Sequence, residues 1–429
     1  MINSINTCLE DENIPRRITP INDTIIAIIG CFWLFTVLRS FYLWNDYEWI
    51  IRAISAFLVF IPTLFFFWSK ELKLYKQNIW FFIIITIYYI FITIVKNQYL
   101  KVMFAQFFTF SLPMLFMLCW PKRDIRNIYK IFRKIIIFYA IGSSIITILT
   151  FTPLINYIPH YDLPAQSALH IRRNLVYRVY IFFVTESNGN ILNSMRACGM
   201  LIEPGHFSII LGFVYLIDKL SGRKINYWLV VCGICTFSFT FFIIAGIAEI
   251  YYMITNHKVL KTIRVFILFL LILLFIYLLL PNYIQDTIYY LIYERNMKDI
   301  VDTFLNTGTI QSALDERTNF EGIYYYEQFI HNSNNLLYGA NIQDDAWILS
   351  DYRGMILNIG IIGLILSLLS ILLSNLLCPM KMRIPLLCAA GLIFLHRSWM
   401  LYYPYIFFIL YMASIVCQHE YEKKKKQKI

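Results

Sequence analysis

Hydrophobic residues run almost without interruption along most of the chain, in blocks that are long enough to cross a membrane as helices. A helix needs about 20 mainly apolar residues to span the hydrocarbon core of a bilayer, which predicts about twelve helices here. The run over 226–255 is too long for one span and short for two, so we expect a break near Ser238–Thr240. The predicted spans are residues 22–39, 50–68, 79–95, 102–120, 135–151, 200–217, 226–240, 241–255, 264–280, 352–374, 384–396 and 402–417.

Two long polar stretches, residues 152–200 and 281–350, interrupt this pattern. Long connections in a compact protein are usually functional or disordered. We therefore expect an all-α fold, in which residues 1–429 form a single integral membrane domain and the two stretches are its large external loops.

The composition agrees with a membrane protein. The chain is 59% hydrophobic and only 15% charged, with a mean hydropathy of +0.61, whereas a soluble domain carries about 25% charged residues. No cleaved signal peptide is expected, because Met1–Pro20 is polar and the first apolar run has spanning length.

The net charge of +11 is explained by membrane topology rather than by nucleic-acid binding. Most of the 37 Lys and Arg residues lie in the short segments that alternate on one side of the predicted bundle. Lys and Arg favour the cytoplasmic side, so both termini are predicted inside and both long loops outside. The terminal run Lys423–Lys426 then lies at the inner lipid surface.

Redox, metal and ion-coupled chemistry are not favoured. Most of the nine cysteines lie in or beside apolar runs, which predicts no disulfide framework, and Cys232 and Cys235 form a CxxC inside a predicted span. His331 with Asp344 and Asp345 matches no known metal-ligand spacing. Glu249 is the clearest charge within a predicted helix, and this scarcity counts against ion-coupled transport.

The first external loop is basic, which the topology rule does not predict for that side. Its charged residues are Arg172, Arg173, Arg178 and Arg196, with Asp162 and Glu186 as the acids. Contact with lipid headgroup phosphates is one explanation for Arg172 and Arg173.

At the end of this loop, Arg196 is followed by Glu203-Pro204 and His206. Pro204 fits the first turn of a helix and favours an extended Glu203. A helix N-terminus would then face outward beside Arg196, a suitable place for a phosphate or pyrophosphate. Glu203 and His206 are candidate acid/base groups there, or Glu203 only caps the helix and His206 is an interfacial side chain.

The second external loop has a composition suited to sugars. It contains Arg317, the run Tyr324–Tyr326 and the pair His331-Asn332. Tyr325 and its neighbours either cover sugar rings or form an interfacial aromatic belt. The next helix opens with Asp351 and Arg353 and continues to Gly360 and Gly363, which we expect to be helix-packing positions. Arg397, in the external turn His396–Trp399, contacts headgroups or faces the same site.

Three local patterns resemble bacterial O-antigen polymerases of the Wzy type, which are related to O-antigen ligases. They are Arg196…Gly199…Glu203-Pro204, Arg317 with the later Leu337-Tyr-Gly339-Ala-Asn341, and Asp351-Tyr-Arg353-Gly354…Gly360-Ile-Ile-Gly363. The layout, with two large periplasmic loops, is similar over nearly the whole chain. Arg178 and Gly189 fit a loose Arg-x10-Gly pattern, which the second loop lacks. A ligase typically has a His-Asn pair after its Gly-rich turn, whereas His331-Asn332 precedes Gly339 here.

The resemblance implies a glycosyltransferase of lipopolysaccharide biosynthesis in the bacterial inner membrane. It would move a growing glycan from undecaprenyl pyrophosphate to an incoming lipid-linked repeat unit at the periplasmic face, without a cofactor. Arg196 and Arg317 are the leading pyrophosphate-binding candidates, followed by Arg353 and Arg397, and Glu203 leads for the base before His206, Glu321 and His331. The implied partners are membrane lipids, a chain-length regulator and a flippase, and both long loops would serve one periplasmic site.

Two alternatives stay open. A flippase for the same lipid-linked sugars also has about twelve helices, although the long external loops and the lack of an internal repeat count against it. An O-antigen ligase or another lipid-dependent glycosyltransferase is the second alternative.

Overall fold

The computed structural model describes most of the chain. The described residues are 23–38, 48–96, 100–163, 175–188, 195–256, 264, 267–268, 271, 274–275, 277–290, 293, 298–307, 320–332, 335–340, 349 and 351–427. They divide into two compact units, one formed by residues 1–136, 334–341 and 351–429 and the other by residues 137–333 and 342–350. The expectation of a single membrane domain stays a prediction.

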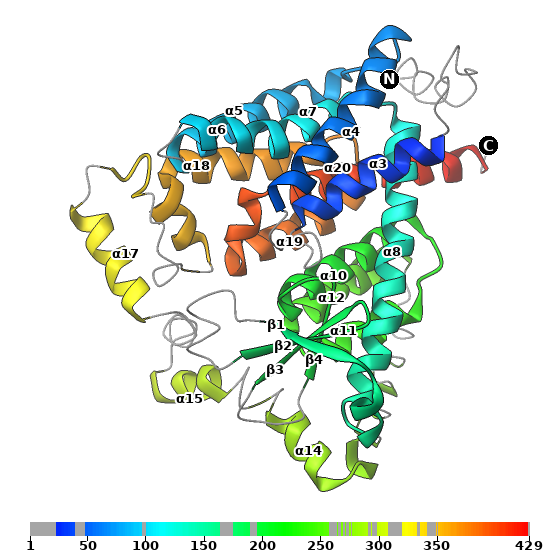
Figure 1. Ribbon diagram of the computed structural model, residues 1–429, viewed down its shortest axis with the longest axis vertical. Coiled ribbons are helices and arrows are strands. Elements are labelled where there is room, and N and C mark those ends of the chain that lie inside the picture. Colours follow the sequence, from blue (N-terminus) through cyan, green and yellow to red (C-terminus); the bar gives the residue numbers. More distant parts are fainter. Residues whose placement is uncertain are drawn as a thin grey trace. The chain divides into compact units, whose positions relative to one another are not determined.

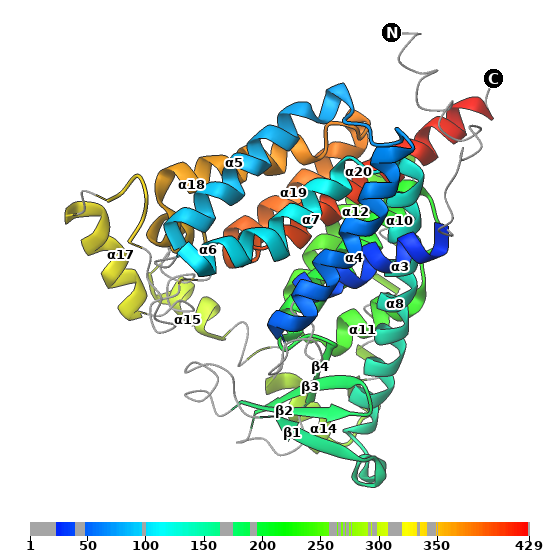
Figure 2. The ribbon, with the colours of Figure 1, turned by 45° about the horizontal axis from the view of Figure 1, so that its top comes forward.

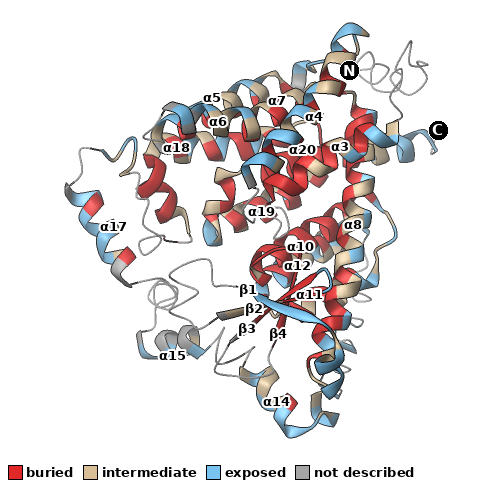
Figure 3. Ribbon diagram, viewed as in Figure 1, coloured by how far each residue is buried: buried red, intermediate tan, exposed pale blue. Residues whose placement is uncertain are grey.

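The first unit is a bundle of helices from both halves of the chain (Figure 1). Its elements are α3 (Asp23–Val37), α4 (Glu48–Trp68), η2 (Lys76–Asn78), α5 (Ile79–Lys96), α6 (Leu100–Gln106), the π-helical turn η3 (Phe107–Ser111), α7 (Leu112–Leu118), the first half of α8 (Lys122–Leu149), α18 (Tyr352–Ser374), α19 (Met380–His396), η7 (Ser398–Tyr402) and α20 (Pro404–Lys426). Helix α20 lies at the centre, since every residue from Pro404 to Cys417 is buried (Figure 3).

Polar side chains fasten α20 inside this bundle. The Tyr411 hydroxyl donates a hydrogen bond to the Leu118 carbonyl at 3.0 Å and accepts one from the Asn78 amide at 3.3 Å. The hydroxyl of Tyr88, on α5, donates to the Leu401 carbonyl just before α20. Buried polar groups stabilise a fold only where they are paired, so these bonds fix the depth of α20 among its neighbours.

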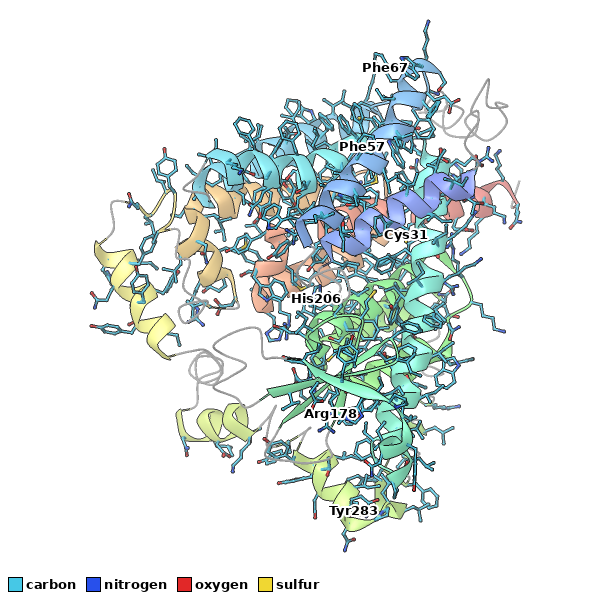
Figure 4. The ribbon with its side chains drawn as sticks, viewed as in Figure 1. Cys31, Phe57, Phe67, Arg178, His206 and Tyr283 are labelled. Carbon is cyan, nitrogen blue, oxygen red and sulfur yellow. The ribbon has the colours of Figure 1, made fainter. Side chains whose placement is uncertain are left out.

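The outward faces of the bundle are apolar. On α5, Ile83, Ile87, Ile90 and Ile94 are 39–58% exposed and recur every three or four residues, as one face of a helix does. Phe57 and Phe67 on α4 are similarly exposed (Figure 4). Such stripes are unfavourable in water and match a lipid-facing surface.

Among the described residues, four helices are long and apolar enough to cross a membrane, namely Trp49–Trp68 of α4, α8, α12 (Phe239–Asn256) and α18. Shorter apolar helices occur at Asp23–Val37, Ile79–Val95 and Phe104–Leu118. The mostly helical fold predicted from the sequence is therefore confirmed, and these apolar helices support the prediction of a membrane protein. The number of spans and the side on which each loop lies stay predictions, and seven of the 17 residues of the proposed span 264–280 lie outside the described residues.

The second unit combines helices with a small sheet, which departs from the all-α expectation. After α8 and η4 (Pro153–Tyr157), the strands β1 (His160–Leu163), β2 (Leu175–Tyr180), β3 (Phe183–Asn188) and β4 (Met195–Gly199) pair antiparallel in chain order (Figure 2). The helices α10 (Pro204–Ser221), α11 (Tyr227–Cys235), α12, α14 (Asn282–Tyr289), α15 (Lys298–Thr307) and α17 (Phe320–Asn332) follow.

The predicted break between the seventh and eighth helices is present. Helix α11 ends at Cys235 and α12 begins at Phe239, close to the expected Ser238–Thr240. Helix α10 packs against α12, α11 and β4, and it is buried along nearly its whole length. The end of the first polar loop is thus folded against the helical core of this unit.

Candidate functional site

The chain enters α10 from β4 through a tight turn. Gly199 ends β4 with a positive φ of 66°, and a β-carbon there would overlap the ring of Phe207. Only glycine adopts this backbone freely and also leaves room for the ring. Glu203 follows in an extended conformation, and Pro204 opens the helix, as the sequence predicts.

The guanidinium of Arg196, on β4, donates hydrogen bonds to backbone carbonyls of the same unit. Its Nε and one terminal nitrogen donate to the carbonyls of Thr236 and Phe237, at 2.9 and 3.2 Å. These two carbonyls lie where α11 ends, so the cation meets unpaired acceptors at the negative end of a helix dipole. The side chain therefore ties the sheet to the break between α11 and α12.

The charge of Arg196 is balanced across the sheet by Glu186. The two residues are opposite one another on β3 and β4, and their side chains form an ion pair of 3.1 Å. Glu186 is 4% exposed and also accepts from the hydroxyl of Tyr177 at 3.5 Å. A buried ion pair is tolerated when further hydrogen bonds satisfy both partners, as they do here.

Tyr177 lies within a group of acidic side chains. Burial raises its pKa above the ordinary value of 10.0, and the nearby carboxylates of Glu186 and Glu203 raise it further. The phenol thus keeps its proton at neutral pH and acts as a hydrogen-bond donor toward the Glu186 carboxylate.

Glu203 and His206 lie at the start of α10, as predicted. The Glu203 side chain makes no capping hydrogen bond, and it is the Glu203 carbonyl that accepts from the backbone N–H groups of His206 and Phe207, each at 3.1 Å. The carboxylate is partly exposed and His206 is 4% exposed; Figure 4 marks His206 on this helix. A helix entrance, a carboxylate, an imidazole and a guanidinium thus occur within one short stretch of chain.

The acids of the described part of the first loop both pair with arginines on neighbouring strands. Arg178 donates to Asp162 at 2.9 Å across β1 and β2, in a partly exposed pair (Figure 4). Arg172 and Arg173 lie outside the described residues. Since the only two acids in the loop are taken by Arg178 and Arg196, the loop's excess charge belongs to Arg172 and Arg173.

A second arrangement of predicted site residues lies in the other unit, at the start of α18. The Asp351 carboxylate caps this helix by accepting from the backbone N–H of Arg353 at 2.9 Å. The same carboxylate accepts from Nε and a terminal nitrogen of the Arg353 guanidinium, at 2.9 and 2.6 Å. Ser398 and Tyr402 bind the adjoining backbone, through the carbonyls of Asp351 and Gly354. The Arg353 side chain is 8% exposed and is held in one orientation.

Gly360 interrupts α18, whereas the sequence suggested a packing position. Its φ of 64° and ψ of −172° are not helical. Gly363, by contrast, stays within the helix, where the atoms nearest to an added β-carbon belong to the side chain of Ile359. A glycine pattern does not by itself distinguish packing from a break, because both use the missing side chain.

Other predicted site residues lie on helices of each unit. Arg397 is half-buried at the end of α19, while Tyr325 and His331 are exposed on α17, which Asn332 ends. Arg317 lies outside the described residues. No three His, Cys, Asp or Glu side chains gather as metal ligands would in the described parts of the chain.

The sequence interpretation did not assign roles to Tyr177, Glu186, Ser398 and Tyr402. The sequence carried little signal for these roles: Arg178 is the only charged residue in Leu175–Tyr180, and Glu186 was visible only as one of the two acids of the first loop. Searches with the chain find no matching protein-family model, no matching characterised protein and no matching solved structure.

Proposed function

We propose that this protein is a membrane glycosyltransferase that polymerises surface polysaccharide, in the manner of an O-antigen polymerase. It would join repeat units carried on undecaprenyl pyrophosphate, at the outer face of the bacterial inner membrane. The observation that carries the proposal is the folded end of the first polar loop, where Arg196, Glu186 and Tyr177 support a helix entrance bearing Glu203 and His206. A linker between membrane helices would need no such buried polar framework.

The proposed reaction breaks the bond between the anomeric carbon of the growing glycan and the carrier pyrophosphate. The acceptor hydroxyl oxygen of the incoming unit forms the new bond at that carbon, its proton passes to the base, and the pyrophosphate leaves with the bonding electron pair. Glu203 is the proposed base, because its carboxylate does not cap the helix and is partly exposed. His206 is the alternative base.

Cations would stabilise the charge that develops on the leaving pyrophosphate. The outward end of α10 contributes a helix dipole, and Arg196 holds that region in place through the α11–α12 break. We therefore assign Arg196 a supporting role in addition to any direct contact, and propose Arg317 as a pyrophosphate ligand. Arg353, in the other unit, is proposed separately as a ligand for the pyrophosphate of a lipid-linked substrate. Arg172, Arg173, Arg178 and Arg397 would add positive charge, and Asp351, Tyr325, His331 and Asn332 would contact the glycan.

The test replaces Glu203 by Gln in cells and measures the length distribution of the surface glycan together with the protein level. We expect single-repeat chains at a normal protein level. The matched control is Asp162→Asn, which removes a carboxylate from an exposed pair on the sheet and should leave long chains. A normal chain-length distribution in Glu203→Gln cells contradicts the assignment of the base.

A transporter of the same lipid-linked sugars is the second candidate, because two apolar segments are interrupted, at Thr236–Ser238 and at Gly360. Interrupted helices are common at the binding sites of transporters. Deletion of the gene distinguishes the candidates: single-repeat surface glycan indicates a polymerase, loss of all surface glycan indicates a flippase, and long chains held only on the lipid carrier indicate a ligase.

A further inference from the structure

Helix α18 consists of two half-helices that meet at Gly360. At a helix interruption, carbonyls before the break and N–H groups after it lose their usual partners. In an apolar environment each such group is costly unless another group binds it. The partners here come from residues 336–340, a segment of the second polar loop.

Backbone hydrogen bonds join this segment to both sides of the break. The N–H groups of Ile361 and Ile362 donate to the carbonyls of Leu336 and Leu337, at 3.1 and 3.2 Å. The N–H of Ala340 donates to the carbonyl of Leu357 at 2.6 Å. The segment is thus inserted into the interruption and replaces the missing helical bonds.

Two glycines make this close approach possible. Gly339 has a φ of 85°, and a β-carbon there would lie 2.6 Å from the backbone carbon of Asn358. Gly360 has a φ of 64°, and a β-carbon there would overlap the backbone of Leu337 and Tyr338. Rotation of a side chain does not relieve either overlap, because the opposing atoms are backbone.

The outer half-helix, Tyr352–Ile359, is held at both of its ends. Ser398 Oγ donates to the Asp351 carbonyl, and the Tyr402 hydroxyl donates to the Gly354 carbonyl at 3.2 Å. The inserted segment holds the other end through Ala340 and Leu357. This short helix carries Arg353, whose guanidinium pairs with Asp351 through two hydrogen bonds. Its axis is set independently of the second half of α18, because Gly360 interrupts the helix between them.

We propose that Gly339 and Gly360 are positioning residues, which direct the outer half of α18 so that Arg353 meets the pyrophosphate of a lipid-linked substrate. This inference rests on the proposed function. A continuous helix would need neither strained glycine nor an inserted segment, and strained backbone that the surrounding contacts over-determine is concentrated at functional sites. The two glycines, 21 positions apart in the sequence, thus form opposite sides of one contact between residues 336–340 and the interruption in α18.

The experiment measures binding of undecaprenyl pyrophosphate to the purified full chain in lipid nanodiscs. Arg353→Lys loses the guanidinium fork, and we expect about tenfold weaker binding, since a hydrogen bond to a charged group contributes at least that factor. Gly360→Ala should weaken binding to a similar extent. The control Gly391→Ala, in α19 with nothing within 4 Å of the added carbon, should bind as the wild type does.

A double variant separates positioning from general structural damage. If Gly360 acts through Arg353, the double variant Arg353→Lys/Gly360→Ala binds undecaprenyl pyrophosphate no more weakly than the single variant with the larger loss of affinity. Tyr402→Phe provides a milder test that keeps both glycines, because it removes only the hydroxyl that holds the Gly354 carbonyl. It should also weaken binding, without adding to Arg353→Lys.

Hydrogen exchange of the Ala340, Ile361 and Ile362 amides reports the insertion directly. They should be protected in the wild type and exchange faster in Gly360→Ala. Two results overturn this inference and leave the proposed function standing. One is unchanged binding in Gly360→Ala despite fast exchange, and the other is a double variant whose loss of binding equals the product of the two single losses. A wild type that binds no undecaprenyl pyrophosphate overturns the proposed function and the inference with it.

Discussion

The two helix interruptions in this protein are stabilised in different ways. Between α11 and α12, the carbonyls of Thr236 and Phe237, which the end of the helix leaves without helical partners, are bound by the guanidinium of Arg196, whose charge Glu186 balances. Within α18, the unpaired groups are bound by the backbone of residues 336–340. The first break depends on a charged side chain, and the second depends on the absence of side chains.

This difference determines which substitutions each break tolerates. Loss of the Arg196 guanidinium leaves a buried carboxylate and two carbonyls without their partner, so the damage at the first break is electrostatic. At the second break the donors and acceptors are backbone atoms, which every substitution except one to proline keeps. Such a substitution does damage only when its added atoms push the two segments of chain apart. Three measurements would sharpen or refute this contrast.

The largest expected effect is that of Arg196→Ala. It leaves Glu186 buried without its counter-charge, and breaking a buried pair in this way costs about 3–5 kcal/mol. The control is Arg178→Ala, which breaks the partly exposed Arg178–Asp162 pair on the same sheet and should cost about 0–1 kcal/mol. Denaturant unfolding of the purified protein in micelles measures both, and equal costs would contradict a buried electrostatic role.

A smaller effect is expected for Gly339→Ala. A left-handed backbone costs an ordinary residue about 1–2 kcal/mol, and the overlap with Asn358 adds to this. Gly246→Ala, in α12 with open space around the added carbon, should instead be neutral or stabilise by up to about 1 kcal/mol. The same unfolding measurement applies, and a stabilising Gly339→Ala would show that residues 336–340 are not tightly inserted.

The smallest effect is a pH dependence that belongs to Tyr177. Burial and the nearby acids raise the pKa of Tyr177 in the folded protein. Above pH 10 the unfolded chain therefore loses this proton while the folded protein keeps it, and stability falls as the pH rises, by about 1.4 kcal/mol per pH unit. Unfolding curves between pH 9 and 11 should be less steep in pH for Tyr177→Phe. An identical slope in both proteins would contradict a raised pKa of Tyr177 in the folded protein.

Local sequence signals predicted the features that depend on neighbouring residues. Pro204 predicted the start of α10, and the length of the apolar run predicted a break near Ser238. Asp351 and Arg353 were placed at the start of a helix, and Asp351 caps it. These features need only a few residues of context.

Features that depend on distant pairing were not predicted. Arg196 was expected to be available for an anion, but its partners are a residue across a sheet and two carbonyls some forty positions later. Gly360 was expected to pack a helix, but the residues that define it belong to the preceding loop. Strand register and loop insertion are set by tertiary contacts, which a single sequence does not display.

The central position of α20 has a consequence for the order of folding during synthesis. The unit that contains it also contains residues 1–136. The helices made first therefore cannot complete their packing until α20, the last of the described helices, has been synthesised. In the other unit, the sheet and α10–α12 follow one another directly in the chain and can assemble beforehand. A chain stopped before Pro404 would therefore retain this local core while leaving Asn78 and the Leu118 carbonyl without the Tyr411 hydroxyl that binds both of them.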